Sequence, residues 1–115
     1  MRILRTVPNL YVPDPEESRR FYRDTLGFAV VMDLGWIVTF ASPERPGSQL
    51  SVLTHDPSGL RPALSVEVDD LEAAHAGMQA QGFEVVYAPR DEPWGVRRFF
   101  VRDPGGVLVN VVMHL

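Results

Sequence analysis

One short phrase that occurs twice constrains the fold of this chain more than any other feature. Residues 27–31 and residues 82–86 both spell G-F-x-V-V. The two copies begin 82 − 27 = 55 residues apart, which is close to half of the 115-residue chain. A period of this length indicates two copies of one supersecondary unit. We therefore predict two similar halves, whose equivalent positions can be compared for the chemistry that they carry.

Turn and helix signals predict the same order of elements in both halves. Asp14 is a good N-cap residue, and Gly27 is typical of the residue that ends a helix. Asp69 and Asp70 start a second helix, which Gly82 ends. Apolar and alternating runs between these signals predict strands. The predicted strands span residues 5–12, 28–32, 36–41, 49–54, 63–68, 83–87, 96–101 and 107–113, and Pro8 assigns the first of them to a sheet edge or a strand end.

Each half therefore has the order β-α-β-β-β. The predicted fold class is α+β, with two tandem βαβββ modules that form a half-open mixed sheet around a cleft. Module one covers about residues 1–55, a polar and turn-rich linker covers 56–62, and module two covers about 63–115. The whole chain, 1–115, is predicted to be one domain. A cleft between packed modules is a usual place for a small ligand.

Composition excludes several classes of function. The chain has no cysteine, so it has neither a disulfide framework nor a thiolate ligand. No apolar run approaches the roughly 18 residues of a membrane span, and the N-terminus lacks a secretory signal. We therefore expect a cytoplasmic protein without a membrane partner. The net charge of −4 argues against nucleic acid as a partner.

Three phrases that together span most of the chain resemble one superfamily. They are V-P-D at 12–14 followed by S-R-R-F-Y-R-D-T-L-G-F at 18–28, V-D-D-L at 68–71, and F-V-R-D-P-G-G at 100–106. This combination is similar to the vicinal oxygen chelate superfamily, which includes glyoxalase I, bleomycin-resistance proteins and extradiol dioxygenases. The resemblance implies the paired βαβββ fold, but the function must be argued from the site itself.

The resemblance also implies four metal-ligand positions, on the first and last strands of each module. Carried over residue by residue, they fall at Val7, Val52, Ala63 and Asn110. The first three side chains cannot bind a divalent metal, and Asn110 offers only a neutral carbonyl oxygen. We therefore predict no metal and no cofactor. A register shift of one residue per strand remains an alternative. Such a shift would bring in Glu67, whose carboxylate is a good metal ligand.

The candidate ligand-binding residues are polar or aromatic side chains expected to face the cleft. Glu67 is a candidate for orienting a ligand or acting as a general base, and otherwise is a solvated strand residue. Arg97 and Arg98 lie on opposite faces of one strand, so one of them is expected to point inward. Trp36 and Trp94 begin equivalent strands, where they offer flat surfaces to a ligand, pack internally, or contact a second subunit. The predicted set is Asn9, Trp36, Phe40, Val52, Glu67, Trp94, Arg97, Phe99 and Asn110.

These features favour a metal-free protein that binds a small aromatic or amphipathic molecule, similar to the bleomycin-resistance branch. Binding itself would be the function, and a homodimer is expected because small two-module members commonly pair. One alternative is a metal-dependent lyase, isomerase or dioxygenase. A second is a metal-free enzyme that uses Glu67 as its base. A third is a regulatory module whose cleft is filled by its own side chains.

Overall fold

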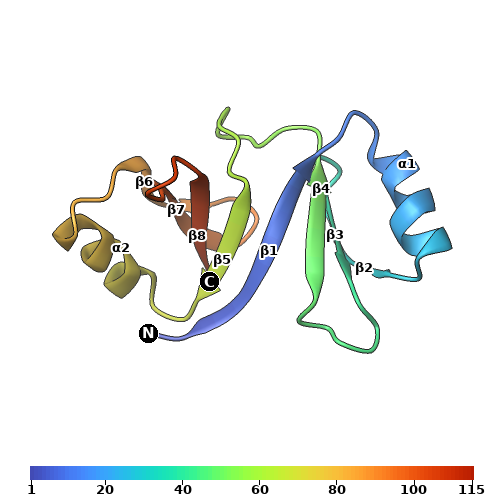
Figure 1. The fold of residues 1–115 in the computed structure, drawn as a ribbon, viewed down its shortest axis with the longest axis horizontal. Coiled ribbons are helices and arrows are strands. Elements are labelled where there is room, and N and C mark those ends of the chain that lie inside the picture. Colours follow the sequence, from blue (N-terminus) through green and yellow to red (C-terminus); the bar gives the residue numbers. More distant parts are fainter. The chain divides into compact units, whose positions relative to one another are not determined.

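The computed structural model describes residues 1–115 and contains eight β-strands, two α-helices and one π-helical segment (Figure 1). The chain divides into two compact units. The N-terminal unit comprises Val7–Arg61, and the C-terminal unit comprises Met1–Thr6 together with Pro62–Leu115. The division after Arg61 falls within the predicted linker. The first six residues, however, belong with the second module and not with the first.

In the N-terminal unit, four strands form a mixed sheet in the order β2-β3-β4-β1. The pairings β2–β3 and β3–β4 are antiparallel, whereas β1 and β4 run parallel. A parallel pair needs a long crossover connection, and the helical segment with β2 and β3 supplies it. The elements are β1 (Ile3–Tyr11), α1 (Pro15–Arg19), the π-helical segment η1 (Arg20–Thr25), β2 (Ala29–Asp33), β3 (Ile37–Ala41) and β4 (Gln49–Leu53).

The C-terminal unit repeats this arrangement, with strand order β5-β8-β7-β6. The β5–β8 pair is parallel, and the other two pairs are antiparallel. Helix α2 begins where the Asp70 side chain accepts a hydrogen bond from the Ala73 backbone N–H at 3.0 Å. It ends before Gly82, which has the positive φ of 78° that only glycine adopts freely. The elements are β5 (Leu64–Val68), α2 (Leu71–Ala80), β6 (Val85–Glu92), β7 (Val96–Arg102) and β8 (Leu108–His114).

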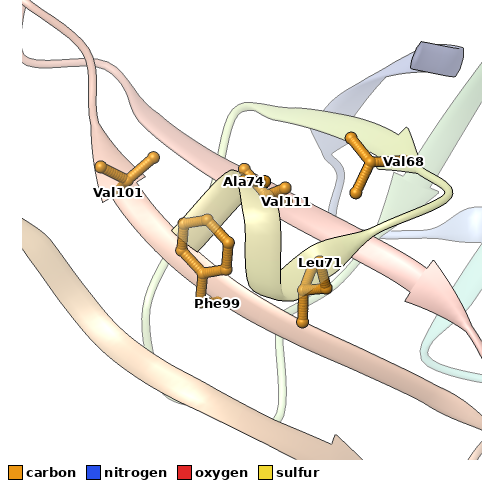
Figure 2. Close-up of a cluster of buried hydrophobic side chains, with 6 residues drawn as sticks. All are labelled: Val68, Leu71, Ala74, Phe99, Val101 and Val111. Carbon is orange, nitrogen blue, oxygen red and sulfur yellow. The ribbon is translucent and has the colours of Figure 1, made fainter. Parts of the chain in front are cut away.

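Each sheet has one face covered by its own helical segment. In the C-terminal unit, Leu71 and Ala74 of α2 pack with strand residues in a buried apolar cluster, which Figure 2 shows around the helix. In the N-terminal unit, Tyr22 of η1 packs against a second apolar cluster. The buried members of the two clusters are Val68, Leu71, Ala74, Phe99, Val101 and Val111 in the first, and Val38, Phe40 and Val52 in the second.

The predicted α+β class and the repeated βαβββ order are confirmed. Several details differ from the sequence prediction, among them the end of β6, which lies at Glu92 and not at the predicted residue 87. The first strand begins at Ile3 and continues through Pro8, and the first helix changes from α to π geometry at Arg20. Aromatic side chains beside a predicted helix are expected to pack in the core beneath it, but Phe21 and Phe83 are 57% and 38% exposed. Neither α-helix nor the π segment is long and apolar enough to cross a membrane.

Candidate functional site

The face of the C-terminal sheet that points away from α2 carries several polar and aromatic side chains. Because side chains alternate along a strand, the residues next to those of the apolar cluster point to this opposite face. Val111 and Phe99 pack on the α2 side, so Asn110 and Phe100 point away from it. We call this surface the Asn110 face. Its members used below are Ser65, Glu67, Tyr87, Arg98, Phe100 and Asn110.

A row of directly paired residues crosses the Asn110 face. Ser65 of β5 pairs with Asn110 of β8, and Asn110 pairs with Phe100 of β7. Phe100 in turn pairs with Tyr87 of β6, beside which the β6–β7 register shifts. The Tyr87 and Phe100 rings are stacked, with centroids 4.6 Å apart and an interplanar angle of 23°. The row is therefore polar at its β5–β8 end and aromatic at its β7–β6 end.

Asn110 is the buried polar centre of this row, with 8% of its surface exposed. Its Nδ2 donates a hydrogen bond to the Ser65 Oγ at 3.0 Å. Its Oδ1 is buried and has no hydrogen-bond partner. A buried amide oxygen without a partner costs free energy, and most such groups in proteins are satisfied. This oxygen is therefore a buried, unsatisfied acceptor on the Asn110 face.

Beside the row lies a buried ion pair between Arg98 of β7 and Glu92 of β6. Glu92 accepts from Arg98 Nε at 2.8 Å and from Arg98 Nη2 at 2.7 Å. The Arg90 guanidinium and the Tyr87 hydroxyl also contact the same carboxylate. The Arg98 guanidinium carbon lies 4.9 Å from the Trp94 ring centroid and 4.7 Å from that of Phe100. The charge of Arg98 is thus neutralised inside an aromatic surround.

Glu67 has both of its carboxylate oxygens in contact with basic side chains. Oε1 accepts from Arg5 Nε at 2.9 Å, and Oε2 lies 3.1 Å from the His114 Nε2. The Glu67 side chain is only 13% exposed. Arg5 comes from the first strand, so this ion pair ties the N-terminal residues to β5. These contacts occupy part of the hydrogen-bonding capacity of both carboxylate oxygens.

Of the predicted site residues in the C-terminal unit, Glu67, Trp94 and Asn110 lie on or beside the Asn110 face. Two others are corrected. Phe99 is fully buried in the cluster under α2. Arg97 lies on the same side, where Glu72 of α2 and Asp91 hydrogen-bond its guanidinium and raise its pKa. The inward residues on β7 are instead their neighbours, Arg98 and Phe100.

The N-terminal unit holds the remaining predicted residues in two different environments. Phe40 and Val52 are fully buried in the core against η1 and β2, so neither side chain is available to a ligand. Asn9 pairs with Ser51, whose Oγ lies 2.7 Å from a buried Thr39 hydroxyl. The three polar residues form a row equivalent to the one through Asn110.

Trp36 precedes β3 and contacts the His55 ring, with centroids 6.2 Å apart. Its ring therefore lies at the end of β3 in the N-terminal unit. Trp94, the corresponding residue of the C-terminal unit, contacts the Arg98 guanidinium. The two tryptophans thus occupy equivalent positions with different neighbours.

The metal-ligand positions implied by the resemblance do not provide a donor set for a divalent ion. Val52 points into the core. Its neighbour Ser51 therefore lies on the opposite face of the sheet. Val7 and Ala63 have no donor atoms in their side chains, and the Asn110 amide is neutral. No group of three or more His, Asp or Glu side chains is placed to hold a metal ion. The residues present therefore do not fit the metal centre of the resembled enzymes.

Comparisons with known proteins agree with this architecture. The sequence profile of the glyoxalase/bleomycin resistance protein/dioxygenase superfamily matches residues 2–111. No functionally curated protein matches the sequence. Among solved structures, the fold is similar to a chain described as NAD-dependent benzaldehyde dehydrogenase from Legionella pneumophila, with a TM-score of 0.78 and 16% identity over 96% of this chain and 99% of that chain.

Two further solved structures have a similar fold. One is a superfamily member from Vibrio splendidus, with a TM-score of 0.67 and 20% identity over 99% of this chain and 100% of that one. The other is methylmalonyl-CoA epimerase from Mycobacterium tuberculosis, with a TM-score of 0.69 and 23% identity over 98% and 87% of the two chains. At these identities the likeness establishes the fold alone. With the profile match across nearly its whole length, the chain belongs to the glyoxalase/bleomycin resistance protein/dioxygenase superfamily.

Proposed function

We propose that this protein is a metal-free binding protein for a small aromatic or amphipathic molecule. The observation that carries the proposal is the row Ser65–Asn110–Phe100–Tyr87, which is set by the registers of three strand pairs. A flat molecule with one polar edge is complementary to such a row, because its ring can stack on the partly exposed Tyr87 while its polar edge meets Asn110.

Binding without turnover is favoured by the contacts of Glu67, the residue predicted as a candidate base. Both of its oxygens are engaged, by Arg5 and by His114. Proton abstraction requires a carboxylate oxygen within hydrogen-bond reach of the substrate proton. The engaged carboxylate instead fastens the first strand to β5. The related folds of an epimerase and a dehydrogenase make an enzyme the competing function.

In this proposal the protein acts by sequestering its ligand, similar to the bleomycin-resistance branch. We further propose that it acts in the cytoplasm as a homodimer, since isologous pairing is the commonest assembly of small soluble chains. Analytical ultracentrifugation tests the assembly directly, and a single monomeric species at micromolar concentration would contradict it.

The binding proposal is tested by titrating ¹⁵N-labelled protein with metal-free bleomycin and with a library of small flat aromatic amides and amines. We expect shift changes in β6, β7 and β8 that persist in EDTA, and weaker binding by Tyr87→Ala. Phe21→Ala, which truncates an exposed aromatic ring on η1, is the matched control and should bind like the parent protein. Absence of any binding, or binding that EDTA abolishes, would refute the proposal.

A Glu67→Gln variant separates binding from catalysis for any compound found in this way. The binding protein should retain its affinity for the compound in this variant, and no product should form with either protein. If the parent protein converts the compound and Glu67→Gln binds it without conversion, the enzyme alternative holds.

A further inference from the structure

We infer that the group of the ligand next to Asn110 is a neutral hydrogen-bond donor attached to an aromatic ring. Ring N–H groups, anilides, lactams and phenols belong to this chemical class. The inference rests on the proposed binding function and specifies the ligand of the same face. In this inference, Asn110 makes the site bind ligands with a hydrogen-bond donor in preference to ligands with an acceptor.

The need for a donor follows from the two ends of the Asn110 amide. Its Nδ2 already donates to Ser65 Oγ at 3.0 Å, whereas its Oδ1 is buried without a partner. A carbonyl oxygen can only accept a hydrogen bond. A ligand that presents N–H or O–H therefore satisfies this atom, and a ligand that presents an ether or ketone oxygen leaves it unpaired.

The aromatic part follows from the neighbour across the sheet. Phe100 is paired directly with Asn110, and Tyr87 stacks on Phe100. Phe100 is itself fully buried, so the aromatic surface on offer to the ligand is the partly exposed ring of Tyr87. Offset stacking on that surface is favourable for a flat ring. A flexible alkyl chain gains no comparable stacking energy there.

The absence of ligand charge follows from the ion pairs of this face. The buried guanidinium of Arg98 is neutralised by Glu92, and the carboxylate of Glu67 is neutralised by Arg5. A charged ligand would lose its hydration and meet groups that are already paired. A neutral donor avoids this desolvation cost.

Three probes of the same shape test the inference. Indole offers a ring N–H, benzofuran replaces that N–H by an ether oxygen, and 1-methylindole blocks it with a methyl group. We expect indole to bind more tightly than benzofuran by about 5- to 150-fold, from the cost of leaving a buried acceptor unpaired. Dissociation constants come from NMR titration of ¹⁵N-labelled protein, with the shift changes mapped onto the Asn110 face.

Two variants identify Asn110 as the source of the preference. Asn110→Leu removes the acceptor, so indole and benzofuran should bind it with nearly equal affinity. Ser65→Ala removes the partner of Asn110 Nδ2, so the amide can present either its oxygen or its nitrogen to the ligand and the preference for indole should fall. It also keeps the inference testable if Asn110→Leu does not fold, which a ¹⁵N spectrum of each variant will show.

The failures of the two proposals are distinguishable. If none of the probes binds and the aromatic library also gives no response, the binding function fails and the inference fails with it. If indole, benzofuran and 1-methylindole bind the Asn110 face equally, binding stands and the inference is overturned. Tighter binding of benzofuran, or a water retained between Asn110 Oδ1 and indole in a crystal structure of the complex, would also overturn it.

Discussion

Replacing Arg98 by methionine should destabilise the protein strongly, although the apolar volume of the side chain is largely kept. The side chains of Arg98 and Glu92 are only 3% and 4% exposed. The substitution removes the two hydrogen bonds of 2.8 and 2.7 Å that Glu92 receives from this guanidinium. The buried carboxylate of Glu92 then keeps its contacts with Arg90 and Tyr87.

Breaking a buried ion pair by removing one partner costs about 3–5 kcal/mol. Because Arg90 still contacts Glu92, we expect the lower end, about 3 kcal/mol of unfolding free energy. That is a large share of the roughly 5–15 kcal/mol by which domains are stable. The double variant Arg98→Met with Glu92→Leu removes both charges, and should lie within about 1 kcal/mol of the parent protein because no buried charge remains unpaired.

Urea unfolding followed by circular dichroism measures these differences. The matched control is Arg102→Met on the same strand, because Arg102 and its partner Glu84 are 42% and 70% exposed. That control should change stability by no more than about 0.5 kcal/mol. A loss below about 1 kcal/mol in Arg98→Met, or a double variant less stable than the single one, would refute the assignment of a buried ion pair.

Three further predictions concern the core, a helix end and an exposed carboxylate. Phe99→Ala, in the cluster under α2, should lower the unfolding free energy by about 3–5 kcal/mol in urea titrations, and a loss under 1 kcal/mol would contradict its burial. Gly82→Ala should cost about 1–2 kcal/mol because of its positive φ, although its Cβ would meet no atom within 4 Å; an unchanged urea midpoint would argue against this strain. The Gly35 N–H and then Arg19 hydrogen-bond Asp33 and lower its pKa, so its stabilising contribution is present above about pH 4 and is lost as pH falls further. Asp33→Asn should therefore be less stable than the parent at pH 7 and closer to it at pH 3, and an equal difference at both pH values would contradict the shift.

Local signals in the sequence predicted most of the fold. The predicted helix start at Asp14 and the predicted end at Gly82 match the structure, because caps and positive-φ glycines act within a few residues. Most strand positions were predicted closely as well, whereas β6 continues to Glu92, beyond the predicted end at residue 87. The change to π geometry at Arg20 was not predicted, and no cap or turn residue marks it.

The candidate site was predicted only in part. Glu67, Trp94 and Asn110 were identified as polar or aromatic residues at informative places, and they lie on or beside one face of the C-terminal sheet. The predicted set omitted Tyr87 and Ser65, and it contained Arg97 instead of Arg98. The contribution of Tyr87 depends on shifts in the β6–β7 register, which no local pattern in the sequence reveals.

The sequence by itself determined the duplication, the order of elements in each half and the membership of the superfamily. Only the tertiary structure decided which side chains of β7 face α2. That strand contains two arginines followed by two phenylalanines, from Arg97 to Phe100, so both of its faces carry the same residue types. A period of two cannot distinguish faces of equal composition. The packing of α2 against Phe99 settles the choice, and it thereby places Phe100 beside the unsatisfied acceptor of Asn110.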